Sequence, residues 1–247
     1  MKTLFKTSLA IVAMVALILT GCKKSDSDSP ASNPITLNTG DQHCHFLDSI
    51  QISATSSSTI TYSTSSKYHA KVDQTGLVVA NKVGTATITL SNGSDTKSLK
   101  IYVEPLCDYY TLPNFKFGVT TRDQVIAQYG TPDQQNSTMI GYYINDEPKL
   151  VMVAFQFENN KLKSMGYTHP KQAYYYHLAF LSERYELIDV STNLLMFINA
   201  LNINDATMVA GLKKGTDNYD LTVYISANSK DADMESTADE YVKAFGL

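Results

Sequence analysis

Three residues able to bind a metal or form a covalent bond stand together at His43-Cys44-His45. In an extended strand, side chains two positions apart point to the same face, so His43 and His45 would have a spacing that a metal could use. No third and fourth ligand is evident nearby, and Cys107 is available as a partner for Cys44. A Cys44–Cys107 disulfide, two free thiols and a metal site therefore all stay open from these residues alone.

Catalytic motifs are missing from the sequence. It contains no Gly-x-Ser-x-Gly nucleophile motif, no Gly-rich phosphate loop and no paired histidines at helical spacing. His69, His169 and His177 are scattered, and the position of His177 beside a predicted apolar helical stripe favours a structural role. We expect a protein without catalytic residues, cofactor or metal. A hydrolase with an unrecognised site is the alternative, and it would require a deep pocket with clustered ionisable groups.

Two clusters suggest ligand binding, and each has a simpler interpretation. The alternation of Asp231, Asp233 and Glu235 could hold calcium, but it lacks the glycine and oxygen spacing of a calcium loop, so a solvated loop is favoured. The run Tyr174-Tyr175-Tyr176 could form a carbohydrate platform. Successive residues on a helix point in different directions, however, so packing in the core and at its rim is favoured.

The first residues of the chain predict export. A cationic start at Met1–Lys6 precedes an uncharged run at Leu9–Leu19, which is shorter than the roughly 20 apolar residues of a membrane-spanning helix. This pattern is typical of a secretory signal. Its end, Leu19-Thr20-Gly21-Cys22, closely resembles the lipobox of bacterial lipoproteins. The resemblance implies removal of residues 1–21 and acylation of Cys22; an ordinary signal peptide with a chance cysteine is the alternative.

A lipid at Cys22 would be the anchor of the protein, because no later segment is apolar enough to span a bilayer. Two or more acyl chains hold a protein stably, at about 0.8 kcal/mol per buried methylene. Residues 22–34 lack large apolar side chains and are predicted to form a flexible tether. Export to an oxidising compartment makes the disulfide the predicted state of Cys44 and Cys107, with a stabilisation of about 4 kcal/mol.

Composition narrows the class of partner. The chain has 247 residues and a net charge of −4, and its only basic pair outside the tether is Lys213-Lys214, so nucleic acid is an improbable partner. Sixteen tyrosines and no tryptophan suit β-rich exported domains, because a tyrosine ring can pack while its hydroxyl stays hydrated. The length is enough for two modest domains.

Residues 35–104 have the alternation of a small β-sandwich. Apolar residues alternate with polar ones at Ile50 and Ile52, within Thr85–Leu90, and at Leu99, Ile101 and Val103. Six or seven short strands in about 70 residues predict an all-β, Ig-like sandwich.

Three segments of this region carry a family resemblance. Ile60–Ser66, Ala70–Ala80 and Gly84–Leu90 resemble the aromatic strand, the Gly-containing hairpin and the Gly-Thr-Ala strand of the group 2 bacterial Ig-like domain. Gly76 supplies the turn conformation of the hairpin, and Tyr62 stands where the family usually has tryptophan. The resemblance implies a spacer or display module of surface proteins.

Residues 108–247 predict an α+β domain. Thr121 and Gln124 form a capping box before a short helix, and Asn159-Asn160 suits a hairpin turn. A second helix is expected after Pro170 and a last one at Ala238–Phe245, capped by Thr237. The predicted strands are 139–144, 150–157, 162–167, 194–199, 206–212 and 219–225. The order gives helices on one face of an antiparallel sheet and a possible tandem α-β-β-β repeat.

The opening of this domain, Phe117–Pro132, resembles tandem-repeat domains like those of the β-lactamase inhibitor protein and of small outer-membrane assembly lipoproteins. The resemblance implies protein binding or scaffolding.

Together these features predict a non-enzymatic, lipid-anchored outer-membrane protein, surface-exposed or facing the periplasm. An Ig-like module would space or display a domain that binds a protein or a glycan. The alternative is a periplasm-facing scaffold component of an envelope assembly machine.

Overall fold

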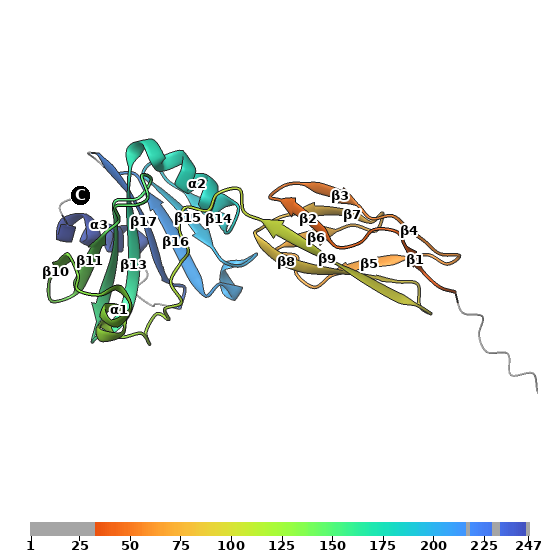
Figure 1. Ribbon diagram of the computed structural model, residues 1–247, viewed down its shortest axis with the longest axis horizontal. Helices are drawn as coiled ribbons and strands as arrows, with labels where there is room; N and C mark the ends of the chain where they lie inside the picture. Colours follow the sequence, from red (N-terminus) through yellow and green to blue (C-terminus); the bar gives the residue numbers. More distant parts are fainter. Residues whose placement is uncertain (1–32, 216–217, 229–232, 246–247) are drawn as a thin grey trace, which may run out of the picture. The chain divides into compact units, whose positions relative to one another are not determined.

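The computed structural model describes residues 33–215, 218–228 and 233–245. The predicted leader, Cys22 and most of the tether lie outside the described residues. Asn33–Leu247 form one compact unit, with a sandwich of strands β1–β9 first and a larger sheet of strands β10–β17 after it (Figure 1). Among the described helices, none has the length and apolar character needed to cross a membrane.

The N-terminal sandwich consists of a four-stranded sheet ordered β2-β9-β8-β5, a three-stranded sheet ordered β3-β7-β6, and the short pair β1-β4. Its strands are β1 (Thr36–Leu37), β2 (Gln42–His45), β3 (Ser49–Gln51), β4 (Ala54–Thr55), β5 (Thr61–Thr64), β6 (Ala70–Val72), β7 (Leu77–Ala80), β8 (Gly84–Ser91) and β9 (Thr96–Glu104). Ala86, Ile88 and Leu90 are fully buried between polar neighbours, which confirms the alternation that predicted a half-buried strand.

Gly76 and Tyr62, two positions of the family resemblance, lie against each other. Gly76 has a φ of +80°, a conformation that side chains disfavour, as the hairpin prediction required. A Cβ at this position would lie 3.0 Å from the Tyr62 ring. The smaller tyrosine ring therefore packs directly on the glycine of the turn.

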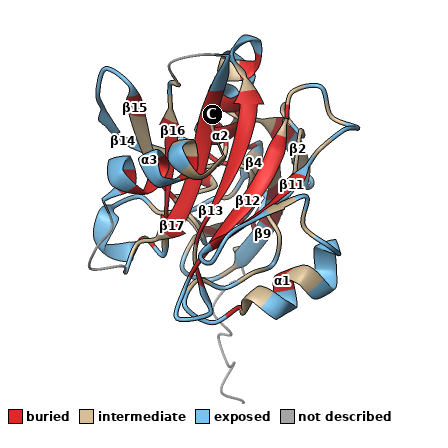
Figure 2. Cartoon of the chain, turned by 90° about the vertical axis from the view of Figure 1, so that its left-hand side faces the viewer, coloured by how far each residue is buried: buried red, intermediate tan, exposed pale blue. Residues whose placement is uncertain are grey.

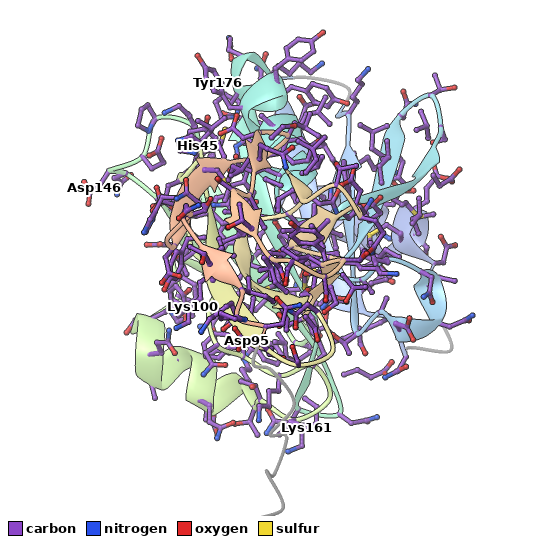
Figure 3. The ribbon with its side chains drawn as sticks, turned by 90° about the vertical axis from the view of Figure 1, so that its right-hand side faces the viewer. His45, Asp95, Lys100, Asp146, Lys161 and Tyr176 are labelled. Carbon is purple, nitrogen blue, oxygen red and sulfur yellow. The ribbon has the colours of Figure 1, made fainter. Side chains whose placement is uncertain are left out.

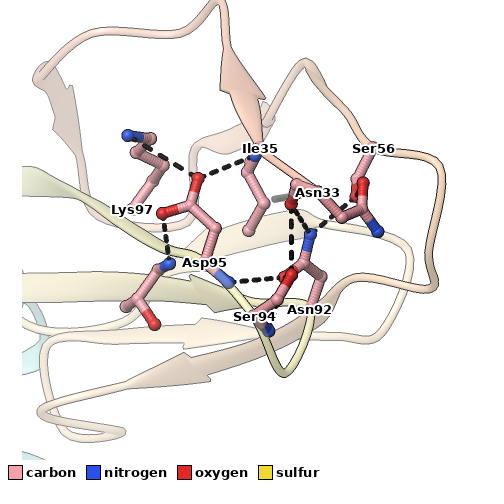
Figure 4. Close-up of polar contacts among 8 residues, drawn as sticks. Asn33, Ile35, Ser56, Asn92, Ser94, Asp95 and Lys97 are labelled. Carbon is pink, nitrogen blue, oxygen red and sulfur yellow. Dashed lines mark hydrogen bonds and ion pairs between the residues drawn. The ribbon is translucent and has the colours of Figure 1, made fainter. Parts of the chain in front are cut away.

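A polar network fixes the start of the sandwich (Figure 4). The Asp95 carboxylate accepts a hydrogen bond of 2.8 Å from the Ile35 amide. The Asn92 side-chain amide donates to the Asn33 carbonyl at 2.7 Å and to the Ser56 hydroxyl at 2.8 Å. The turn between β8 and β9 thus holds Asn33, inside the predicted tether, and Ile35, just after it.

The C-terminal sheet domain contains one antiparallel sheet of eight strands, ordered β10-β11-β12-β13-β17-β16-β15-β14. Its elements are α1 (Arg122–Tyr129), β10 (Gln134–Gln135), β11 (Met139–Tyr143), β12 (Met152–Glu158), β13 (Lys161–Pro170), η1 (Lys171–Ala173), α2 (Tyr174–Ser182), β14 (Glu186–Val190), β15 (Leu194–Ile198), η2 (Ile203–Asp205), β16 (Met208–Lys213), β17 (Tyr219–Ser226) and α3 (Met234–Phe245). Each of the first two helices precedes four strands, not the predicted three; β10 and β14, at the two edges of the sheet, were missed.

Helices cover both faces of this sheet, and the prediction of one covered face needs correction. Val125 of α1 and Phe180 of α2 belong to the core on one face, whereas Met234 and Tyr241 of α3 belong to the core on the other. The central strands β12, β13 and β17 are accordingly buried along most of their length (Figure 2). Met152 and Val153, adjacent on β12, point to opposite faces of the sheet and pack in different cores.

Three glycines let α3 approach its face of the sheet. A Cβ on Gly141 would lie 3.0 Å from side-chain atoms of both Met152 and Phe245. A Cβ on Gly166 would lie 3.0 Å from the Tyr241 ring, and one on Gly211 would lie 2.6 Å from the Met234 side chain. Glycine at these strand positions thus makes room for side chains of α3.

The starts of two helices confirm one prediction and correct another. The Thr121–Gln124 capping box is present as predicted. The last helix starts at Met234, four residues before the predicted start, because the Asp233 carboxylate accepts hydrogen bonds from the Glu235 and Ser236 amides, each at 3.1 Å. Thr237 lies inside this helix and is not its cap.

The buried Glu183, just after α2, holds the segment that joins the two sheets. Its carboxylate accepts hydrogen bonds from the Leu106 and Cys107 amides, at 2.9 and 3.0 Å, and pairs with Arg184. The Glu183 carbonyl also accepts from the Val83 amide at 2.7 Å. A carboxylate shielded from water in this way is stabilised by the amides that it accepts from.

Candidate functional site: a tyrosine-lined groove

A groove of about 440 Å³ opens on the C-terminal sheet domain. Six tyrosines line it, supplied by the joining segment, α1, β11 and β13: Tyr109, Tyr110, Tyr129, Tyr142, Tyr143 and Tyr167. Its volume lies within the range of roughly 300–1,000 Å³ typical of small-ligand pockets. Tyr142 and Tyr167, from the strands, are buried, whereas Tyr129 of α1 and Tyr143 of β11 remain partly exposed.

The inner rings form a packed aromatic layer. Tyr110 stacks on Tyr167 with 4.1 Å between ring centroids and on Phe180 with 4.4 Å. Tyr129 lies against Tyr142 at 5.2 Å. Because these rings support one another, the groove has a fixed wall of aromatic surface, with Tyr129 remaining 36% exposed.

The phenol groups of the groove differ in whether protein atoms satisfy them. Tyr110 shares a hydrogen bond of 2.8 Å with Tyr224, and Tyr142 donates to the Gly130 carbonyl at 3.0 Å. Within the described part of the chain, the Tyr167 hydroxyl has no such partner, although the residue is only 3% exposed. Burial raises the pKa of the Tyr167 phenol, so this hydroxyl stays protonated and can donate a hydrogen bond.

The rim of the groove carries negative charge. Asp146 and Glu147, in the loop after β11, line it, and none of the described side chains that line it is basic. Asp146 projects outward from this loop (Figure 3). A cation, Lys149, lies beside the rim, with its ammonium 4.6 Å from the centroid of the Tyr109 ring and 3.6 Å from Glu147. The groove therefore combines aromatic surface with hydrogen-bond acceptors.

The predicted disulfide is not formed in this structure, where Cys44 and Cys107 are free thiols. Cys44, on β2, is buried in the core of the sandwich, whereas Cys107 packs against a core of the C-terminal sheet domain. The two side chains therefore pack in different cores. Burial raises the pKa of the Cys44 thiol.

The alternating histidines beside Cys44 make contacts within the sandwich. His43 Nδ1 pairs with the Glu104 carboxylate at 2.6 Å, and His45 Nδ1 lies 3.2 Å from the Glu104 carbonyl oxygen. Across the described residues, no group of three or more His, Cys, Asp or Glu side chains is arranged to hold a metal ion.

His169 and His177 come together although the sequence did not pair them. His169 on β13 and His177 on α2 are fully buried and stacked, with centroids 3.7 Å apart. Their Nδ1 atoms have no hydrogen-bond partner among the described residues. His69 lies apart from them, over Gly84 of the sandwich, where its ring leaves no room for a Cβ.

The two clusters that suggested ligands lie outside the groove. Tyr175 and Tyr176 are exposed on α2 and Tyr174 is half-buried, so only part of this run packs as predicted. Asp233 caps α3 and Glu235 lies in its first turn, while Asp231 is outside the described residues.

Little in the sequence indicated the groove. Its tyrosines are separated by up to 58 positions, from Tyr109 to Tyr167, and belong to four different segments. The available signal was the abundance of tyrosine and the pairs Tyr109-Tyr110 and Tyr142-Tyr143. Only the sheet brings these positions together.

No curated protein shows significant similarity to the chain. Among solved structures, domains 4–9 of the surface layer protein SbsC match with 10% identity and a TM-score of 0.25, over 80% of this chain and 27% of that one. Human protocadherin-24 EC1-2 matches with 11% identity and a TM-score of 0.25, over 78% of this chain and 95% of that one. This chain thus spans about a quarter of the length of the SbsC structure.

The family comparison is more specific, because it covers nearly all of the sandwich with its predicted hairpin and its buried alternating strands. Residues 37–103 of this chain match the bacterial Ig-like domain (group 2), which supports the Ig-like assignment of the sandwich.

Proposed function

We propose that the chain is a lipid-anchored protein of the bacterial cell envelope, in which the Ig-like domain displays a ligand-binding domain. The proposal rests on the order of the parts: the lipobox ending at Cys22, a polar segment, and then the Ig-like domain at residues 37–103. An Ig-like domain suits spacing because, placed between the lipobox and the C-terminal sheet domain in the chain, it would separate that domain from the anchor.

The C-terminal sheet domain would supply the binding function. This domain consists of two halves, and in each half a helix is followed along the chain by four strands. The two halves join in one sheet where β13 pairs with β17. This order supports the α+β interpretation and the resemblance to tandem-repeat binding domains. The tyrosine-lined groove is the surface on it that we assign to a protein or glycan ligand.

A binding role without catalysis fits the chemistry of the groove. Burial raises the pKa values of the Tyr129 and Tyr142 phenols, as it does for Tyr167, so they remain neutral hydroxyls and not phenolate nucleophiles. Neutral phenols serve as hydrogen-bond donors and as packing surfaces.

Protease treatment of intact cells tests the display part of the proposal. The wild-type protein should be degraded at the cell surface, and Cys22→Ala should leave the membrane fraction. Cys107→Ala, which keeps the lipobox, is the matched control and should stay membrane-bound. Protection of the wild type until the outer membrane is opened would contradict display and favour the periplasm-facing assembly scaffold.

A further inference from the structure

The charge of the tyrosine-lined groove restricts its ligand. Two carboxylates, Asp146 and Glu147, lie at the rim, and no basic side chain lines the groove among the described residues. Lys149, beside the rim, pairs with Glu147 at 3.6 Å, so Asp146 is the carboxylate that an anionic ligand would meet without a compensating cation in the lining, at an electrostatic cost. Phosphorylated, sulfated and sialylated ligands are therefore disfavoured.

The surface of the groove presents both aromatic and polar groups. The ring of Tyr129 is partly exposed beside the buried Tyr142 ring, and the rim offers carboxylate and amide oxygens. A pyranose has the matching character, because one of its faces carries C–H groups that pack on an aromatic ring while its hydroxyls lie around the edge. Carboxylates accept hydrogen bonds from such hydroxyls.

The Tyr167 hydroxyl is the polar group that would fix the position of the ligand. It belongs to a residue that is 3% exposed, borders the groove, and has no hydrogen-bond partner within the described part of the chain. The hydroxyls of Tyr110 and Tyr142 are already engaged by Tyr224 and Gly130. A ligand oxygen that enters the groove can replace the solvent at this donor.

Resting on the proposed binding function, we propose that the groove binds the terminal sugars of a neutral glycan. Tyr129 packs against the apolar face of a sugar ring, Tyr167 donates to a sugar oxygen, and Asp146 accepts from sugar hydroxyls. The volume of about 440 Å³ suits the end of a glycan more than a folded protein surface.

Calorimetric titration of the purified full chain tests this assignment. The probes are cellotetraose, maltotetraose, mannotetraose and chitotetraose, with sialyllactose as the anionic probe and choline as the cationic one. Saturable binding of at least one neutral tetrasaccharide, and none of sialyllactose, is the expected result. Because the chain has no tryptophan, tyrosine fluorescence provides an independent readout of the same titration.

Substitutions of the tyrosines in the groove test whether the saccharide binds there. Tyr167→Phe removes one hydroxyl and keeps the ring, so the affinity for the bound tetrasaccharide should fall roughly threefold to tenfold, the effect of one neutral hydrogen bond. Tyr129→Ala should lower it at least as much. Tyr175→Phe, on α2 and outside the groove, should leave the affinity unchanged. Thermal melts establish that each variant is folded.

Three outcomes overturn the assignment: no neutral tetrasaccharide binds, whether or not choline does; sialyllactose binds as well as the neutral tetrasaccharides; or a tetrasaccharide binds Tyr167→Phe and Tyr129→Ala as tightly as the wild type. These failures are distinguishable from failure of display, because protease treatment of cells would still report surface exposure of the wild-type chain.

Discussion

His169 on β13 and His177 on α2 stack face to face in the core of the C-terminal sheet domain, with 3.7 Å between ring centroids and no exposed surface. His169 Nε2 contacts the Thr222 hydroxyl at 3.2 Å, and His177 Nε2 contacts the Lys149 carbonyl at 2.9 Å. Burial lowers the pKa of both histidines, and the neighbouring His177 ring adds to the decrease at His169, so that the pKa of His169 is about 2 and that of His177 about 4. Both are therefore neutral in the folded protein near neutral pH.

This pair predicts sensitivity to acid. Below pH 6.5, the ordinary histidine value, the unfolded chain binds protons that the folded chain does not, so stability falls as pH falls. The slope approaches about 1.4 kcal/mol per pH unit for each histidine until its folded pKa is reached. Urea unfolding between pH 7 and pH 4 should show that His177→Gln reduces this slope.

The exposed His43 provides the control for the acid prediction. Its side chain is 61% exposed, so His43→Gln should leave the loss of stability between pH 7 and pH 4 unchanged. An unchanged slope in His177→Gln would mean that the pair is not the source of acid sensitivity.

The contact of Gly211 with Met234 predicts a site intolerant of any side chain. A Cβ on Gly211 would lie 2.6 Å from Met234, so Gly211→Ala should displace α3 and lower the free energy of unfolding by about 1–3 kcal/mol. Gly40→Ala is the matched control, because nothing lies within 4 Å of its Cβ position and its φ is not positive. Denaturant unfolding measures both, and equal stability of the two variants would contradict the tight docking of α3.

The hydrogen bond from the Ile35 amide to Asp95 predicts a protected start of the sandwich. Asp95→Ala should increase hydrogen exchange at Ile35, whereas Lys97→Ala should not, because the exposed Lys97–Asp95 pair at 3.7 Å contributes little. The Ile35 amide holds the pKa of the Asp95 carboxyl below its usual value. The stabilisation is therefore present above the ordinary carboxyl pKa and is lost as pH falls through the lowered one. Slow exchange at Ile35 in Asp95→Ala would argue against this role.

The free thiols of Cys44 and Cys107 should react with a thiol reagent at different rates. In the native chain, a maleimide should modify Cys107 before Cys44, because Cys44 is buried and its burial raises the thiol pKa. Mass spectrometry of the chain, denatured without reductant and then alkylated, should find both residues alkylated. Recovery of a peptide linking Cys44 to Cys107 would restore the disulfide that the sequence predicted.

Local patterns determined much of the fold. The alternation of Ala86, Ile88 and Leu90 predicted a half-buried strand, and Thr121 with Gln124 predicted a helix start, because both signals act between residues near in sequence. Asn159 and Asn160 have φ values of +50° and +60°, as a hairpin turn there required. The Ig-like domain could be inferred for the same reason, since its hairpin and strands each carry their own pattern.

Tertiary structure alone decided which faces, edges and side chains meet. The strand at 150–157 reads as apolar, but only the docking of α3 shows that both its faces are buried. The side chains of the short strand β14 are mostly exposed, so its sequence does not show the alternation of apolar and polar residues that predicts a half-buried strand. The six tyrosines of the groove and the His169–His177 pair come from segments distant in sequence, and their proximity depends on strand order and helix placement, which no local pattern encodes.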